Sequence, residues 1–181
     1  MKKPDWKAWL NDEKDCKLWL SRYIKNKMLR KKKDESALHL RKTDHNLNFA
    51  NWIFEKHKDE IPKFFGKDTF YDWVVTIYYY AVYHASMALV SKEEYDSKSH
   101  SATLCFLISH YYHSKKSLGN EEIELIAGYL SKEDIEILGI SKDLRERASY
   151  DVHELFERKL AEDARTKAIN FINKSKAILA Q

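Results

Sequence analysis

Hydrophobic residues recur every three or four positions along most of this chain, which is the spacing of one face of an α-helix. Polar residues fill the intervening positions, and strict alternation typical of strands is not apparent. The pattern predicts helices over residues 5–29, 36–58, 68–90, 99–115 and 121–130, and from 141 to the C-terminus. With only four glycines and two prolines in 181 residues, turns are few. We therefore expect an all-α protein with one domain.

The most apolar stretch, WVVTIYYYAVYHASMALV at 73–90, has no charged residue. It is long enough to cross a membrane, but its hydroxyl groups and imidazole are costly to bury in lipid, so a buried helix of a soluble bundle is preferred. His84 falls on a stripe with Trp73, Ile77 and Ala88. We expect this stripe to be buried and His84 to be structural, hydrogen-bonded to a Ser or Tyr hydroxyl or a backbone carbonyl of the next helix.

Positive charge is concentrated near the N-terminus. Residues 1–42 carry a net charge of +8, whereas the remaining 139 carry −4. The run KNKMLRKKK at 25–33 is the centre of this charge and suits an RNA backbone or an acidic partner. A solvated basic stretch without a ligand is the alternative. The candidate RNA-backbone residues are Lys25, Lys27, Arg30, Lys31, Lys32 and Lys33.

The residues that usually mark cofactor or metal chemistry form no complete motif. Cys16 and Cys105 lie far apart in the sequence and suggest no disulfide framework, which favours a reducing, cytoplasmic location. His110 and His113 are spaced to share an ion on one helix face, but nothing supplies a third ligand. A glycine-rich phosphate loop is also absent. We expect neither a metal nor a cofactor.

The segment LRERASYDVHELFERK at 144–159 combines Arg145, Arg147 and His153. Arginine binds phosphate, and histidine transfers protons near neutral pH, so the three suit metal-free RNA cleavage. On an unbroken helix, however, Arg147 and His153 would be about 120° apart, so one site requires a bend or two subunits. The alternative is an ion-pair cluster with the acidic residues between 151 and 157.

Four segments stand out in order along the chain: YYYAVYHASMALV (78–90), SKSHSATLCFLI (97–108), RERASY (145–150) and EDARTKAINFINKSKAIL (162–179). Together they resemble the HEPN domain, a helical domain found in prokaryotes and higher eukaryotes, and most of all its small stand-alone prokaryotic members. The helix at 37–55 also fits the first helix of that family, so the resemblance covers about 36–180 and leaves 1–34 as a basic, tryptophan-rich helical arm on a bundle at 35–181.

The resemblance implies an up-and-down bundle of five to six helices, here with an additional N-terminal helix, and commonly a homodimer. It also implies three roles: a metal-independent endoribonuclease, a nucleotide-binding module, or the partner of a small nucleotidyltransferase in a toxin–antitoxin-like pair. The nuclease branch has an arginine, four to six residues and then a histidine, which Arg147 and His153 match.

Three hypotheses follow. The first is a dimeric ribonuclease, of toxin–antitoxin or defence type, with Arg147 and His153, and Arg145 assisting. The second is a non-catalytic module that binds a nucleotide or a nucleotidyltransferase through Ser99, His100, Tyr150 and His84. The third is a helical oligomerisation or scaffold protein that uses the tryptophan-rich arm. RNA or a nucleotide, a second copy and a nucleotidyltransferase are the expected partners, and a membrane is not.

Overall fold

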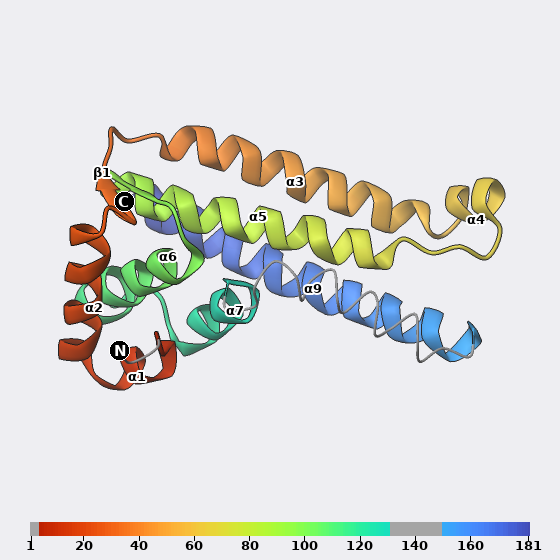
Figure 1. Ribbon diagram of the computed structural model, residues 1–181. Coiled ribbons are helices and arrows are strands. Elements are labelled where there is room, and N and C mark those ends of the chain that lie inside the picture. Colours follow the sequence, from red (N-terminus) through yellow and green to blue (C-terminus); the bar gives the residue numbers. More distant parts are fainter. Residues whose placement is uncertain (1–3, 131–149) are drawn as a thin grey trace.

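The computed structural model describes residues 4–130 and 150–181, and the side chains of residues 4–130 and 157–181 (Figure 1). The all-α expectation is confirmed, with one small two-stranded sheet added. The elements are α1 (Trp6–Asn11), α2 (Glu13–Lys25), β1 (Leu29–Lys31), α3 (Ser36–Lys56), α4 (Glu60–Phe65), α5 (Tyr71–Lys92), β2 (Tyr95–Ser97), α6 (His100–Leu107), the π-helix η1 (Ile108–Ser114), α7 (Asn120–Leu130) and α9 (Tyr150–Leu179).

Three long helices form the body of the molecule, and α5 lies between α3 and α9 (Figure 1). Helix α3 runs antiparallel to α5, and α9 runs in the same direction as α5. Polar contacts fix this arrangement along its length. Arg165 of α9 donates to Glu55 of α3 at 2.8 Å, and Tyr78 of α5 donates to Asn51 of α3 at 2.7 Å. The three helices therefore share one packed core.

Helix α5 is apolar around most of its circumference because it is covered on several sides. It is the one described helix long and apolar enough to span a membrane, and 67% of its most apolar window is buried within the protein. That burial is typical of the core helix of a soluble protein. The buried face runs through Val74, Tyr78, Ala85 and Leu89. The expected burial of the stripe was wrong at Trp73, which is 56% exposed, whereas Ile77 is partly buried against the core.

The N-terminal segment packs into the same core as the bundle. Trp9, Cys16 and Trp19 are buried where α1 and α2 contact α6 and η1, at the end of the molecule opposite α4 (Figure 1), and Leu29 of β1 is buried in the same core. The single helix expected over 5–29 is divided at Asp12, whose carboxylate caps α2 by accepting from the backbone of its first turn.

A short sheet joins this segment to the end of α5. Helix α2 ends at Lys25, and Lys27 has a left-handed φ of 57°, which turns the chain away from the helix axis. Strand β1 then pairs antiparallel with β2, with Leu29 opposite Ser97. The sequence pattern did not predict these strands.

The two cysteines, 89 positions apart in sequence, are neighbours in the fold. Their sulfur atoms lie 4.0 Å apart across the contact between α2 and α6, and both thiols are free and buried. Each thiol also donates to the other residue's backbone carbonyl, at 3.6 and 3.5 Å. The pair therefore marks a buried contact between the N-terminal segment and the bundle.

Candidate functional site

A cluster of histidine and tyrosine rings connects α3, α5, α6 and α7. Ser99 caps α6 by accepting from the backbone of Ala102 at 3.1 Å, which makes His100 the first residue of the helix. His100 Nε2 lies 3.4 Å from the hydroxyl of Tyr79, and its ring centroid lies 5.4 Å from that of Tyr83. Tyr79 in turn contacts Tyr129 of α7, with centroids 5.7 Å apart. Ser99 and His100, both sequence candidates, thus lie beside α5.

On the other side of Tyr83, His84 faces a histidine of α3. The His84 and His39 ring centroids lie 5.8 Å apart with planes inclined by 32°. The Nδ1 atoms of both rings are buried and have no hydrogen-bond partner among the described residues. The expected hydrogen bond of His84 to the next helix is therefore not made at Nδ1, and the ring instead faces an imidazole of the preceding long helix.

Both imidazoles are neutral at neutral pH. Burial lowers the pKa of His84 to about 4, with further lowering from His39 and Lys42. Burial also lowers the pKa of His39. A neutral imidazole carries one N–H donor and one acceptor, so each ring has unused hydrogen-bonding capacity at Nδ1. A buried polar atom left without a partner costs about 1–3 kcal/mol, and a bound molecule would recover that energy if the rings turned to present Nδ1 to it.

We call these residues the histidine–tyrosine cluster. His39, Tyr83, His84 and His100 are each partly exposed, although the Nδ1 atoms of the first and third are buried. The cluster comprises His39, Tyr79, Tyr83, His84, His100 and Tyr129.

Three of the six basic candidates are engaged within the chain. Arg30 forms an ion pair with Asp96 at 3.0 Å, Lys32 forms one with Glu35 at 2.7 Å, and the Lys31 ammonium lies 4.1 Å from the centre of the Tyr95 ring. The other three are exposed and form no ion pair within the described part of the chain: Lys25, Lys27 and Lys33. The basic run is thus folded into β1 and its flanks, with those three lysines left to attract an anion.

The candidate catalytic residues fall where the structure describes little. Arg145 and Arg147 lie outside the described residues, as does the His153 side chain, although its backbone belongs to α9. Their proposed convergence stays a prediction.

Tyr150 is the first residue of α9, and its side chain lies outside the described residues. Thr69, just before α5, donates to Glu157 of α9 at 2.6 Å, which fixes where α9 passes the start of α5. The expected convergence of Tyr150 with Ser99 and His100 stays a prediction.

The two histidines spaced for a shared ion face different partners. His110 Nε2 lies 3.1 Å from a carboxylate oxygen of Glu93, whereas His113 Nε2 lies 2.8 Å from the backbone carbonyl of Trp9. Both lie in η1, whose π-helical winding changes the angle between positions three apart. Across the described residues, no group of three or more His, Cys, Asp or Glu side chains is placed to hold a metal.

Sequence reasoning did not assign His39, Tyr79, Tyr83 or Tyr129 to a site. The spacing of Tyr79 and Tyr83, four apart on a helix that also carries His84, was the available signal. His39 had no such signal, because its neighbour His84 is on another helix.

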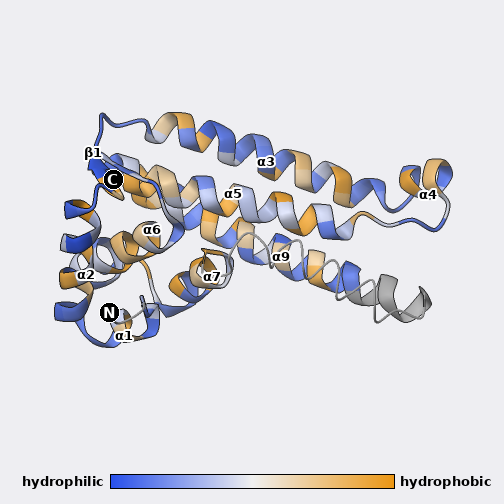
Figure 2. Cartoon of the chain, in the orientation of Figure 1, coloured by the Kyte–Doolittle hydropathy of each residue, from blue (hydrophilic) through white to orange (hydrophobic). Residues whose placement is uncertain are grey.

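A separate apolar groove lies at the other end of α5. It has a volume of about 470 Å³ and is bounded by α3, α4 and α5. Its walls include Phe49, Trp52, Phe64, Phe65 and Trp73, all strongly exposed. Figure 2 shows hydrophobic colour on α4, at the tip of the molecule.

Comparison with known proteins returned no match among protein-family models, curated proteins or solved structures. The case for a function therefore depends on the residues and on the geometry described above.

Proposed function

We propose that this chain binds nucleotides, free or within RNA, as a protein of the HEPN type, and that the histidine–tyrosine cluster is its base-binding surface. The observation that carries the proposal is the pair of facing rings, His39 and His84, whose buried Nδ1 atoms have no partner within the described residues.

The chemistry of the cluster matches that of a nucleobase. A base edge presents hydrogen-bond donors and acceptors side by side, and two neutral imidazoles can satisfy them. The faces of a base stack on aromatic rings, and Tyr83 and His100 offer partly exposed rings next to His84. Recognition of this kind needs no metal and no glycine-rich loop.

Cations near the cluster supply the attraction for phosphate. Lys42 is exposed one helical turn from His39, and its charge contributes to lowering the pKa of both His39 and His84. Contacts of this type weaken as salt rises, whereas contacts to the base do not. Salt dependence therefore separates the two contributions.

RNA cleavage is the finer activity that we propose within this function. His153 would transfer the protons, and Arg147, assisted by Arg145, would stabilise the charge on the phosphate. The support is the Arg–His spacing and the HEPN resemblance. A metal-independent endoribonuclease of toxin–antitoxin or defence type, with a small nucleotidyltransferase as partner, is the corresponding biological role, and the free thiols suit the cytoplasm.

The binding test uses isothermal titration with mononucleotides and fluorescence anisotropy with a labelled single-stranded RNA. We expect His84→Gln and His39→Gln each to weaken binding by about tenfold, the effect of losing one hydrogen bond in a partly buried site. His45→Gln is the matched control, because His45 is an exposed histidine on the same helix as His39. Equal affinity for the wild type and both cluster variants would reject the assignment of the base-binding surface. Mononucleotide binding without RNA binding identifies a free nucleotide as the ligand.

The cleavage test is independent of that result. Wild type, Arg147→Ala and His153→Ala are incubated with RNA in the presence of a chelator, and the products are separated on a gel. We expect cleavage by the wild type and its loss in both variants. Cleavage that persists in both variants rejects the catalytic pair, and no cleavage by any of them leaves binding as the function.

A further inference from the structure

The groove between α3, α4 and α5 exposes an aromatic surface at the upper end of what a typical monomer shows. The exposed fractions are 78% for Phe64, 56% for Trp52 and Trp73, 53% for Phe65 and 47% for Phe49. With about 200 Å² for each side chain, the exposed aromatic area is about 600 Å². Contiguous apolar patches of that size generally mark interaction sites.

The polar groups of the groove identify the class of partner. Lys56 forms an ion pair with Glu60, and its ammonium lies 5.8 Å from the centre of the Trp52 ring. The two charges of opposite sign leave the lining neutral. RNA and anionic lipid both require net positive charge, so neither suits this surface. A protein surface that carries apolar side chains and charges of both signs suits the groove better.

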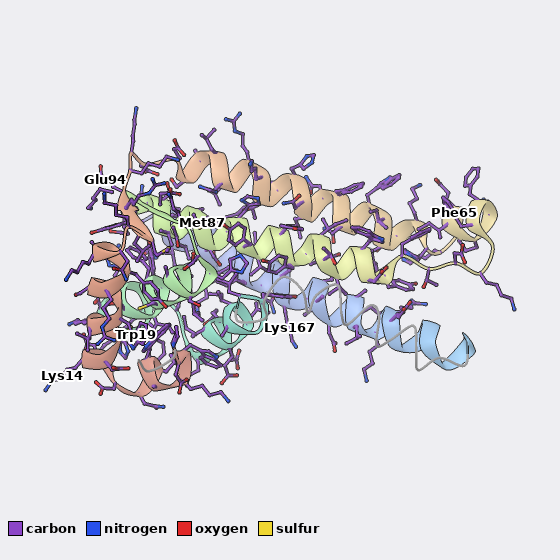
Figure 3. The ribbon with its side chains drawn as sticks, viewed as in Figure 1. Lys14, Trp19, Phe65, Met87, Glu94 and Lys167 are labelled. Carbon is purple, nitrogen blue, oxygen red and sulfur yellow. The ribbon has the colours of Figure 1, made fainter. Side chains whose placement is uncertain are left out.

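The chain itself carries such a surface. Phe64 is the most exposed of the large hydrophobic side chains described, and it stands on α4 in the outer wall of the groove. Figure 3 shows Phe65, its neighbour, at the tip of the molecule, far from the labelled Trp19. Gly66 ends α4 with a left-handed φ of 64°, which a residue with a side chain would adopt only under strain. A protruding ring and a hollow thus lie side by side on one face.

We propose that this face, which we call the aromatic groove, joins two copies of the chain in a symmetric dimer, with Phe64 of each copy seated in the groove of the other. In a twofold arrangement the same patch faces itself, so the ring and the hollow complement each other. Lys56 and Glu60 can likewise pair across the axis.

The available area matches what a dimer needs. A standard interface buries about 800 Å² on each partner, of which about 65% is apolar in homodimers, or about 520 Å². The aromatic groove alone provides that apolar area. This interface is independent of nucleotide binding, because the groove and the histidine–tyrosine cluster share no residue.

The first experiment measures mass in solution by sedimentation equilibrium over a concentration series of the full chain. We expect a dimer for the wild type, and a dissociation constant raised at least about thirtyfold by Phe64→Ser or Trp52→Ser. Leu18→Ser is the control, because Leu18 is 50% exposed on α2, at the opposite end of the molecule. Unchanged circular dichroism verifies the fold of each variant. A monomeric wild type, or a dimer indifferent to both groove substitutions, overturns the proposal.

The second experiment tests the twofold pairing. Lys56→Glu and Glu60→Lys each place like charges at the interface, so each variant alone is expected to be monomeric. A mixture of the two is expected to form a heterodimer, because an acidic pair then faces a basic pair across the axis. A mixture that stays monomeric, while the wild type dimerises, refutes the pairing of Lys56 with Glu60.

Discussion

The proximity of Cys16 and Cys105 leads to a prediction about the N-terminal segment. A disulfide between them would require the two sulfur atoms, now 4.0 Å apart, to approach to about 2.05 Å. Side-chain rotation at both residues would have to cover that distance. The bond would tie α2 to α6, and it should stabilise the fold only if the segment packs on the bundle as described.

The size of the effect follows from the loop that the bond closes. The residues are 89 positions apart, and closing a loop of that length lowers the entropy of the unfolded chain by an amount worth about 4–5 kcal/mol at 25 °C. Strain in the folded state reduces this gain, so we expect a net stabilisation of about 2–4 kcal/mol. At a typical urea dependence of about 2 kcal/mol per molar, the unfolding midpoint would rise by about 1–2 M.

The assay is urea unfolding before and after oxidation. The hydrogen bond with Cys16 and burial raise the pKa of the Cys105 thiol, which slows attack by its thiolate. Oxidation is therefore performed during refolding at mildly alkaline pH, with diamide accepting two electrons and two protons from the thiols. Dithiothreitol should reverse the shift, and Cys16→Ala and Cys105→Ala should not show it. Only intermolecular disulfides, or an intramolecular bond that leaves stability unchanged, would refute the packing.

Two further outcomes are expected. Trp9→Ala should destabilise the protein by about 3–5 kcal/mol in urea unfolding, because Trp9 is 1% exposed, while Leu18→Ala, at a half-exposed position, should cost less than about 1 kcal/mol. His84 has a pKa of about 4 in the fold and 6.5 as its ordinary value, so the unfolded chain binds the proton first. The contribution of neutral His84 to the free energy of unfolding is constant above pH 6.5 and is lost as the pH falls from 6.5 to 4. The His84→Gln variant should therefore lose less stability over that pH range than the wild type, by at most about 3 kcal/mol. An equal loss of stability in the wild type and the variant would contradict this prediction.

Helix α5 and the capping of α6 by Ser99 were predictable because their signals are local. An uninterrupted apolar stretch and a serine before a helix carry the information within a few residues. The exposed position of Trp73 was not predictable, because a helix apolar on nearly every side gives no preferred face. Which side stays open is decided by how α3 and α9 pack against it.

The features that the sequence did not predict are formed by residues that lie far apart in the chain. His39 and His84 face each other only because α3 and α5 are antiparallel and aligned in one register. Strands β1 and β2 are three residues each, too short for a periodic pattern, and they form through pairing with each other. A single sequence contains no direct record of such contacts.

The packing of the N-terminal segment on α6 also has a consequence for synthesis on the ribosome. Cys16 cannot be buried until Cys105, 89 residues later in the chain, has been synthesised. At about 5–20 residues per second, that interval is roughly 4–18 s. During it, Trp9 and Trp19 have no completed core to enter. The segment therefore stays exposed until α6 has been synthesised, and chaperones that bind aromatic side chains have that time to act on it.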